Sequence, residues 1–258
     1  MNQDSTDETV LLEVSNLVKR YNGKAVVDRF SFNVRRGEIV GLLGRNGAGK
    51  TTTFRMTVGM IDAQEGRVMF DGRDVTNLPM YKRAQLGMGY LSQEPSVFQR
   101  LSVTQNLMAI LETMKDLTRK ERLAQIEQLI EQFGLQDQRN QQARTLSGGE
   151  RRKLEIARAL VTQPKLIMLD EPFSGVDPKS VEDLQAEILH LKRDRGIAIL
   201  LTDHNVRETL RVTDRSYILH EGKKLAEGAP HEIVRNPLVR KAYLGTRFRD
   251  DEFDNDRA

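Results

Sequence analysis

Near the N-terminus, apolar and polar residues alternate in short runs that predict β-strands. Residues 10–36 contain two such runs, separated by the turn-forming pair Asn22-Gly23. A side-chain period of two on either side of an Asn-Gly turn is typical of a β-hairpin, so this region predicts antiparallel strands. A further run at 68–70, followed by an Asp-Gly pair, predicts another strand and turn.

Other apolar runs are continuous and predict strands buried on both faces. They occupy residues 37–43, 165–170 and 197–203, and such runs are typical of a parallel sheet covered by helices. Between 103 and 134 the apolar residues recur at helical spacing. The pattern predicts an α/β fold with a parallel core sheet, an N-terminal antiparallel β-subdomain and an α-helical subdomain inserted at about 95–163.

Composition narrows the class of protein only slightly. The 258 residues include 40 Lys and Arg against 37 Asp and Glu, a formal charge of +3, and no basic stripe suggests nucleic acid as a partner. The chain has no cysteine, which excludes disulfides and thiolate metal sites and is compatible with a reducing cytosol. Its apolar runs fall far short of the ~20 residues that cross a membrane. Any membrane association is therefore expected to come through a partner.

The two ends of the chain differ from the predicted domain at 10–245. Residues 1–9 are polar, without the basic and apolar parts of a signal peptide, and we expect them to be disordered. Residues 246–258 form an acidic tail, of which the last ten carry five acids and two arginines. That composition predicts a solvated tail.

A glycine-rich loop lies between the buried run at 37–43 and a helix predicted from Thr52 to Met60. Its glycines permit backbone conformations that let loop amides wrap a phosphate, helped by the helix N-terminus. Lys50 is then expected at the β- and γ-phosphates and the Thr51 hydroxyl on Mg²⁺. The alternative is a glycine-rich turn with an incidental Lys-Thr pair. The predicted ATP-binding residues here are Gly44, Arg45, Asn46, Gly47, Ala48, Gly49, Lys50, Thr51 and Thr52.

A second glycine-rich helix start follows Leu146. Ser147 and Glu150 have the spacing of a capping box, so we expect Ser147 to begin a helix that continues to about residue 162. One interpretation is a plain capped helix. The other is an anion site made by Ser147, Gly148 and Gly149. It would need a second phosphate, or the same phosphate approached from another subunit.

Two carboxylates and a histidine follow buried strands. Asp170 ends the run at 165–170 and Glu171 follows it, and His204 follows the run at 197–203. Ligands of open α/β sheets bind beyond the carboxyl ends of the strands. Asp170 can there hold Mg²⁺ through water, Glu171 can orient or deprotonate an attacking water, and His204 can bond a γ-phosphate. The alternatives are an acidic turn and an ordinary surface or core histidine.

Two further polar positions depend on neighbouring elements. Tyr21 precedes the first turn, where it either packs as a strand residue or stacks on adenine. Gln93 ends a strand predicted at 88–92, and Glu94-Pro95 forces a break after it.

Together these motifs resemble the nucleotide-binding subunits of ATP-binding-cassette (ABC) transporters over residues 10–245. The resemblance implies an ABC-type P-loop fold that hydrolyses ATP with Mg²⁺. By position, the matches are the adenine-stacking Tyr21, the Walker A loop at 44–51, the Mg²⁺-contacting Gln93, the signature at 146–150, the Walker B Asp170 with the catalytic Glu171, the D-loop at 174–177 and the switch His204.

The resemblance also implies an assembly. In this family two cassettes pair head to tail, and each ATP lies between one Walker A loop and the other chain's signature. One copy of each motif implies a homodimer or pairing with a similar chain, closed by ATP and released by hydrolysis.

Within the family, residues 93–98, 170–178 and 202–210 resemble the ATPases of lipopolysaccharide export. This implies a cytoplasmic protein, peripheral on the inner membrane, that binds two transmembrane permeases near Phe98 and Arg100. Gln99 departs from the arginine expected there. Branched-chain amino-acid importers are the alternative, because the C-terminal Tyr-Leu-Gly at 243–245 resembles both groups. Soluble cassettes that act on ribosomes or DNA usually carry a second cassette or a long coiled coil, and this chain has neither.

Overall fold

The computed structural model describes residues 10–93, 96–114 and 116–245, together with Phe248 and Phe253. The predictions for residues 1–9, for the break at Glu94-Pro95 and for most of the acidic tail fall outside this part of the chain. Within it, no helix combines the length and apolarity needed to cross a membrane.

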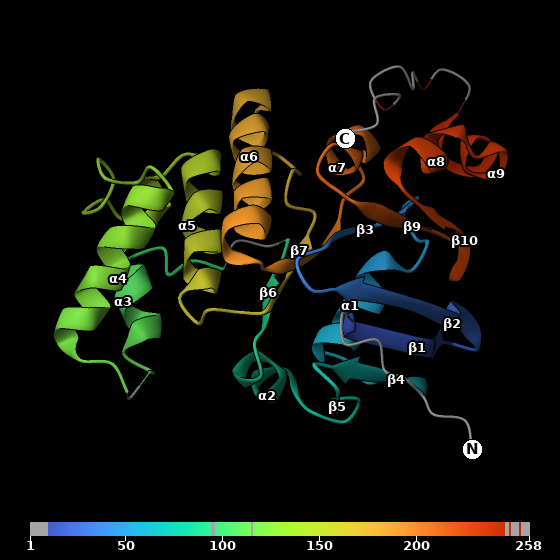
Figure 1. Ribbon diagram of the computed structural model, residues 1–258, viewed down its shortest axis with the longest axis horizontal. Helices are drawn as coiled ribbons and strands as arrows, with labels where there is room; N and C mark the ends of the chain where they lie inside the picture. Colours follow the sequence, from blue (N-terminus) through green and yellow to red (C-terminus); the bar gives the residue numbers. More distant parts are fainter. Residues whose placement is uncertain (1–9, 94–95, 115, 246–247, 249–252, 254–258) are drawn as a thin grey trace.

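A six-stranded, largely parallel sheet forms the centre of the molecule (Figure 1). Its strand order is β10-β9-β3-β8-β7-β6, and within the described part of this sheet β9–β10 is the only antiparallel pair. Every residue of β3, β7 and β8 is buried, which confirms the three predicted buried strands. The bounds are β3 Ile39–Gly44, β6 Met88–Leu91, β7 Leu166–Asp170, β8 Ala198–Thr202, β9 Arg215–His220 and β10 Lys223–Gly228.

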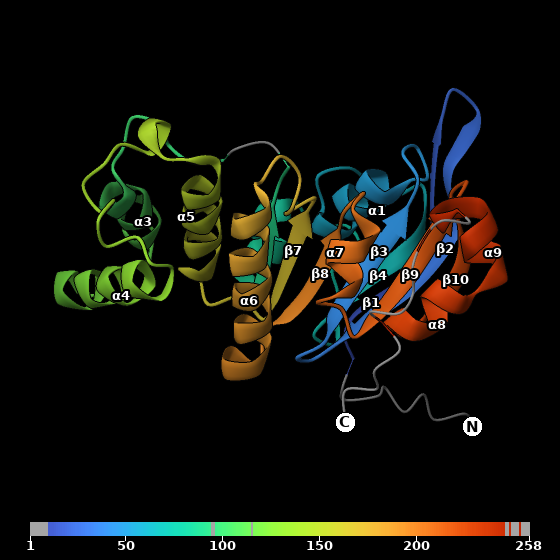
Figure 2. The same cartoon turned by 90° about the horizontal axis from the view of Figure 1, so that it is seen from above.

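The predicted antiparallel subdomain is a second sheet, ordered β2-β1-β4-β5. It comprises β1 Val10–Tyr21, β2 Lys24–Arg35, β4 Glu65–Phe70 and β5 Arg73–Asp74. Asn22 and Gly23 join β1 to β2 with φ of 49° and 80°, so both adopt the left-handed conformation that a tight hairpin requires. Figure 2 shows this hairpin projecting beside the core sheet.

Helix α1 (Lys50–Val58) links the two sheets through one apolar core. Phe54 and Met56 of α1 are buried with side chains from both sheets. The helix begins and ends two residues before the predicted Thr52–Met60. It ends at Val58 because Gly59, at φ 81°, donates its amide to the carbonyls of Arg55 and Met56.

Helices α3 and α4 lie at one end of the molecule, with α5 and α6 between them and the sheet (Figures 1 and 2). A second apolar core joins them to β7 and β8. The predicted helical stretch at 103–134 is two helices, because Thr118 caps a new one with a capping box. The bounds are α3 Val103–Leu111, α4 Arg119–Gln132, α5 Gly148–Leu160 and α6 Pro178–Arg195.

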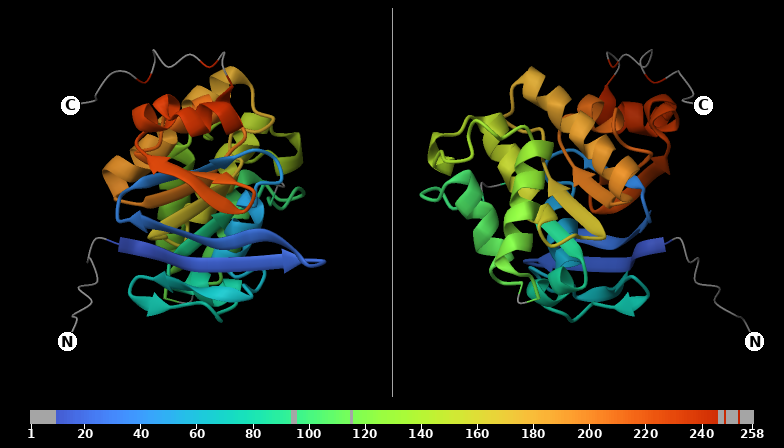
Figure 3. Two further views of the ribbon diagram at one scale, coloured as in Figure 1. Left: turned by 90° about the vertical axis from the view of Figure 1, so that its right-hand side faces the viewer. Right: turned by 60° about the vertical axis from the view of Figure 1, so that its left-hand side comes forward.

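The C-terminal region covers the far end of the core sheet, opposite the antiparallel strands (Figure 3). The helix predicted at 231–243 is three short elements, since Pro237 cannot donate an amide within a continuing helix and begins a new one capped by Asn236. The remaining helices are α2 Met80–Gln85, α7 Val206–Leu210, α8 Pro230–Arg235, α9 Pro237–Val239, the 3₁₀ turn Ala143–Thr145 and the π turn Arg240–Leu244.

Phe253 corrects the prediction of a wholly solvated tail. Its side chain is buried in a third apolar cluster and stacks on Phe248 with ring centroids 6.3 Å apart. The cluster offers an apolar surface next to α7 and β9, which an aromatic side chain within an acidic sequence can still cover.

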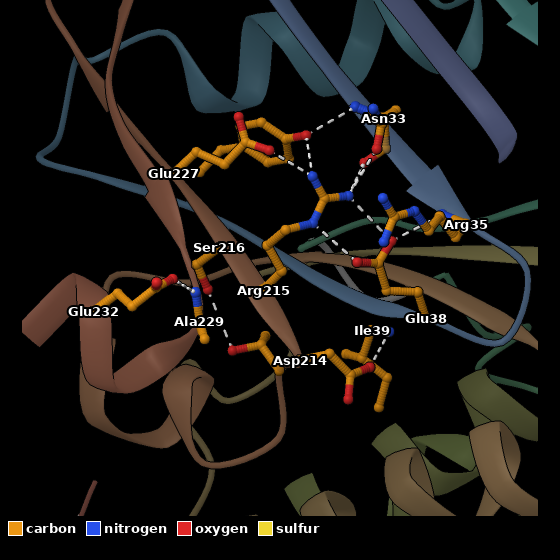
Figure 4. Close-up of polar contacts among 12 residues, drawn as sticks. Asn33, Arg35, Glu38, Ile39, Asp214, Arg215, Ser216, Glu227, Ala229 and Glu232 are labelled. Carbon is orange, nitrogen blue, oxygen red and sulfur yellow. Dashed lines mark hydrogen bonds and ion pairs between the residues drawn. The ribbon is translucent and has the colours of Figure 1, made fainter. Parts of the chain in front are cut away.

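One partly buried arginine ties the two sheets together (Figure 4), near the start of β3 and away from the glycine-rich loop. Arg215 of β9 donates Nε and Nη2 to the two carboxylate oxygens of Glu38 at 2.9 and 3.1 Å, and Nη2 to Asn33 Oδ1 of β2 at 2.7 Å. Glu227 of β10 accepts a further bond. A bidentate pair of this kind holds strand geometry as well as charge, so Arg215 fixes β2 against β9 and β10.

Candidate active site

A pocket of about 470 Å³ opens beyond the carboxyl ends of β3, β7 and β8, where the sheet geometry predicts a ligand. It brings together the glycine-rich loop with the polar residues that follow the central strands. Its lining residues are Val26, Asn46, Gly47, Gly49, Lys50, Thr51, Thr52, Gln93, Glu171, Ser174 and His204.

Backbone conformation at the loop depends on glycine. Gly47 and Gly49 have φ of 80° and 105°. A Cβ on Gly49 would lie 2.6 Å from the carbonyl oxygen of Val26, so any side chain there would collide with backbone. Among the described residues, no side chain caps α1 and no acidic residue occupies its first turn. The amides at this helix start can therefore donate hydrogen bonds to a bound anion.

Lys50 is the buried cation of the pocket. Its side chain is 6% exposed, and Nζ donates to the Gly44 carbonyl at 2.7 Å. Burial lowers the pKa of Lys50, against the opposing effect of the carboxylates of Glu171, Asp170 and Asp203. A cation here is suited to phosphate oxygens, because little water competes for it.

The two carboxylates after β7 are held differently. Asp170 is buried and its Oδ1 accepts a hydrogen bond from Thr202 Oγ1 at 2.7 Å. Glu171 has a left-handed backbone, φ 49°, and its amide donates to the Thr202 carbonyl at 2.9 Å. Burial raises the pKa of the nearby Tyr90, and the Asp170 carboxylate adds to this rise.

One oxygen of Glu171 is the meeting point of the polar cluster. Oε2 accepts a hydrogen bond from Gln93 Nε2 at 2.8 Å and lies 3.5 Å from His204 Nδ1. The same His204 nitrogen lies 3.4 Å from Oδ1 of the fully buried Asp203. The structure thus places the four residues predicted to be catalytic, Lys50 included, around one pocket. A carboxylate held this way can orient a water for in-line attack.

Some predicted ligand residues lie outside this pocket's lining. Tyr21, at the end of β1, is 48% exposed with the Lys19 ammonium 5.7 Å from its ring centroid. Within the loop, Arg45 is exposed and Ala48 is buried. Asp170 is not among the lining residues, and its Oδ1 accepts a hydrogen bond from Thr202.

The second glycine-rich helix start has its expected cap but lies apart from the pocket lining. Ser147 Oγ accepts the Glu150 amide at 3.3 Å, and Glu150 Oε2 accepts the Ser147 amide at 2.8 Å, which confirms the predicted capping box. Gly148 has open space around it, whereas a Cβ on Gly149 would lie 2.5 Å from Ser180 Oγ. Any phosphate bound here is therefore separate from one at α1 of the same chain.

Two described residues that flank Gln93, Ser92 and Ser96, are bonded to α5. Their partners are the buried pair Arg152–Glu155, 2.8 Å apart. Arg152 Nη1 donates to the Ser92 carbonyl at 3.1 Å, and Glu155 Oε1 accepts the Ser96 amide at 2.9 Å. Hydrogen bonds thereby connect Ser92 and Ser96 to the helix that begins at Ser147.

The two predicted docking residues are on the surface. Phe98 is 47% exposed, with the Arg158 guanidinium 4.8 Å from its ring centroid. Its amide donates to the fully buried Asn106 at 2.9 Å, so its backbone is fixed while its ring stays accessible. Arg100 is also exposed.

Sequence reasoning missed Thr202, Val26 and Asp203 as parts of this site. Thr202 and Asp203 close an apolar run, where polar residues at the carboxyl end of a strand were the available signal. Val26 carried no signal, because it joins the site only through hairpin packing against the loop.

Comparison with known proteins agrees with this geometry. The sequence profile described as "ABC transporter" matches residues 27–174, and that described as "Branched-chain amino acid ATP-binding cassette transporter" matches 223–249. The Lipopolysaccharide export system ATP-binding protein LptB of Haemophilus influenzae is 51% identical over 239 residues, covering 93% of this chain and 99% of that protein. A probable ABC transporter ATP-binding protein of Azorhizobium caulinodans is 52% identical over 92% of this chain and 84% of its own length.

The fold has the same relatives. The crystal structure of the ADP conformation of an ATP-binding cassette of an ABC transporter superposes with a TM-score of 0.81 at 30% identity, covering 92% of this chain and 99% of that one. The chain therefore belongs to the ABC transporter family, as an ATP-binding cassette with ATPase activity.

Proposed function

We propose that this chain is the ATP-hydrolysing subunit of a transporter that extracts and exports lipopolysaccharide from the inner membrane. Support comes from the relatives named for lipopolysaccharide export, which match nearly their whole length at 51% identity. The rival cargo is a branched-chain amino acid, favoured by the profile that matches 223–249. Both functions use the same ATP site and differ in the membrane partner.

The observation that carries the catalytic proposal is the convergence of Gln93 and His204 on one oxygen of Glu171 beside the glycine-rich loop. Glu171 takes the role of orienting or deprotonating the attacking water, and His204 bonds the γ-phosphate. Lys50 holds the β- and γ-phosphates, with the loop amides around them. Tyr21 stacks on the adenine, since the residue is 48% exposed and a base has a flat face to pack on its ring.

Mg²⁺ is the proposed metal, held by Thr51, Gln93 and, through water, Asp170. These residues offer oxygen ligands, and the described residues contain no cluster of three or more His, Cys, Asp or Glu that would suggest another metal. A site with one carboxylate suits Mg²⁺, which keeps waters and shares substrate phosphates. When bound, the ion would neutralise charge on the β- and γ-phosphate oxygens.

The assembly proposed is a head-to-tail homodimer on two permease subunits. Ser147, Gly148 and Gly149 of each chain face the ATP of the other, since their own pocket lies elsewhere. The permeases dock near Phe98 and Arg100. The protein is then cytoplasmic and peripheral on the cytoplasmic face of the inner membrane, associated only through these partners, with no nucleic acid involved.

The test of catalysis is Glu171→Gln, which keeps size and hydrogen bonding but removes the charge. ATP hydrolysis should fall by about 10²–10⁴-fold while ATP affinity is kept, and an ATP-bound dimer should accumulate on size-exclusion chromatography. Glu131→Gln, an exposed change on α4, is the matched control and should behave as wild type. Hydrolysis near the wild-type rate in Glu171→Gln would remove Glu171 from its role.

The test of cargo is a detergent pull-down of tagged protein from its own membranes, followed by mass spectrometry. Two related permeases with a periplasmic bridge-like partner would support lipopolysaccharide export. Branched-chain amino-acid permeases would transfer the same catalytic assignments to an importer. Recovery of ribosomal proteins alone would contradict both.

A further inference from the structure

Thr202 contacts both residues of the Asp170-Glu171 pair. It is the last residue of β8, its side chain is fully buried, and it lies opposite Asp170 in the β7–β8 pairing. Its hydroxyl donates to Asp170 Oδ1 at 2.7 Å, the shorter of its two contacts. The same oxygen lies 3.3 Å from the donating amide of Glu171, which also bonds the Thr202 carbonyl at 2.9 Å. One side chain thus touches both carboxylate-bearing residues.

The Glu171 backbone makes this contact consequential. At φ 49° it adopts the left-handed conformation, which is uncommon for a residue with a side chain and must be maintained by its surroundings. The amide of Glu171 is held by two oxygens of Thr202, so the direction in which the chain leaves β7 depends on that residue. The direction of the chain sets where the Glu171 carboxylate lies relative to Gln93 and His204.

Asp203, the residue that follows Thr202, makes further hydrogen bonds near Glu171. Asp203, also fully buried, accepts the Phe173 amide through Oδ2 at 3.0 Å and the Asn205 amide through Oδ1 at 2.9 Å. Two consecutive residues, Thr202 and Asp203, therefore pin the chain on both sides of Glu171. They do so from the segment that carries His204.

We propose that Thr202 is a positioning residue for the ATPase site. This role rests on the function proposed above. Its hydroxyl fixes the orientation of Asp170 toward Mg²⁺ and, through the Glu171 amide, the place of the Glu171 carboxylate. Ligand-orienting hydrogen bonds of this kind change metal affinity or activity by about 10–100-fold when removed. Thr202 contacts neither reacting atoms nor the pocket, so its effect passes through the two acidic residues.

The test compares Thr202→Val, which keeps the shape and removes the hydroxyl, with Thr202→Ser, which keeps the hydroxyl. In Thr202→Val the Mg²⁺ concentration for half-maximal hydrolysis should rise about tenfold or more, and kcat should fall on the same scale. Thr202→Ser should restore both to within about threefold of wild type. ATP affinity without Mg²⁺ should be unchanged in both, since Asp170 acts through the metal.

A readout independent of turnover is the thermal shift caused by ATP with and without Mg²⁺. Wild type and Thr202→Ser should gain extra stabilisation from Mg²⁺, and Thr202→Val should lose most of that increment. Thr213→Val is the matched control, because it removes another buried threonine hydroxyl, 3.2 Å from Ser216 Oγ and away from the pocket. It should lower the melting temperature without changing the Mg²⁺ increment.

The outcomes separate this inference from the proposed function. A wild-type protein that fails to hydrolyse ATP with Mg²⁺ overturns the function itself. With an active wild type, a Thr202→Val variant whose Mg²⁺ dependence equals that of Thr213→Val overturns the role of Thr202. Loss of ATP binding without Mg²⁺ that serine does not restore would also overturn it, as a purely structural effect. If Thr202→Val does not fold, Thr202→Ala takes its place in the same comparison.

Discussion

The chain has two glycine-bearing helix starts that are built in opposite ways. At α1 the N-cap is Gly49 in a left-handed conformation, with no side-chain cap and no first-turn acid among the described residues. At α5 the N-cap is Ser147, whose hydroxyl and whose partner Glu150 satisfy two helix amides within the chain. One helix start leaves its donors for a ligand, and the other supplies its own acceptors.

The surroundings follow the same division. Around α1 the chain gathers Lys50, Gln93, Glu171 and His204 into a pocket. Around Gly148 it leaves open space. A helix N-terminus alone therefore does not define a phosphate site. The first is a candidate complete within one chain, whereas the second depends on what another molecule brings to it.

Gly49→Ala should strongly weaken ATP binding at the start of α1. Its Cβ would meet the Val26 carbonyl at 2.6 Å from a φ of 105°. Strain of about 3 kcal/mol corresponds to about a 100-fold loss of ATP affinity, measurable by nucleotide titration. Gly134→Ala is the control, since it also has positive φ but no atom within 4 Å, and its ATP affinity should stay at the wild-type value. Full ATP affinity in Gly49→Ala would show that the loop does not bind phosphate through its backbone.

Gly148→Asp should disrupt the proposed binding of a partner's phosphate at the start of α5 without destabilising the fold. A carboxylate at a helix N-terminus is favourable for the helix, and Gly148 has the space for it, but the added charge would repel a partner's phosphate. ATP binding by the single chain should be kept, while ATP-driven dimerisation and hydrolysis fall by about 10²-fold, comparable to loss of transition-state donors elsewhere.

Mixing the Gly148→Asp and Gly49→Ala proteins tests whether each ATP site is shared between two chains. In a head-to-tail dimer, a mixed pair contains one intact site, made from the loop of one chain and the signature of the other. Two inactive proteins should therefore regain part of the activity when mixed. A mixture no more active than its components would contradict sites shared between chains.

Phe98→Glu tests whether the exposed surface at Phe98 binds the permeases. The ring is half exposed while its backbone bonds the buried Asn106, so a charge should spare the fold and the isolated ATPase, within about twofold. Transport and permease binding should be lost. Tyr81→Glu, at another exposed aromatic, is the control that should retain both. Equal loss of soluble ATPase activity in Phe98→Glu would rule out a docking role.

Sequence patterns predicted the strands and helix starts that depend on local sequence. Continuous apolar runs located β3, β7 and β8, and Ser147 with Glu150 located the start of α5. Features that depend on packing at a distance were not predicted. Thr202 joins Asp170 only because β7 and β8 are neighbours in the sheet, 32 residues apart in sequence. The Arg152–Glu155 pair has the sequence pattern of a charged helix face, but in the fold it is buried and bonds Ser92 and Ser96.

The smallest effect separates the two roles that Ser147 can have. Ser147→Ala removes one helix cap, which costs about 1 kcal/mol and should lower the melting temperature by about 2–4 °C. Ser102→Ala is closely matched, because Ser102 caps α3 with the same capping box, its hydroxyl accepting the Gln105 amide at 3.2 Å. The two variants should melt alike, since each loses the same kind of bond on an exposed helix start. Only Ser147→Ala should also weaken ATP-driven dimerisation, because only α5 would face a partner's phosphate. If the two variants dimerise equally well, Ser147 is a cap and nothing more, and the recognition of the partner's ATP passes to the backbone of Gly148 and Gly149.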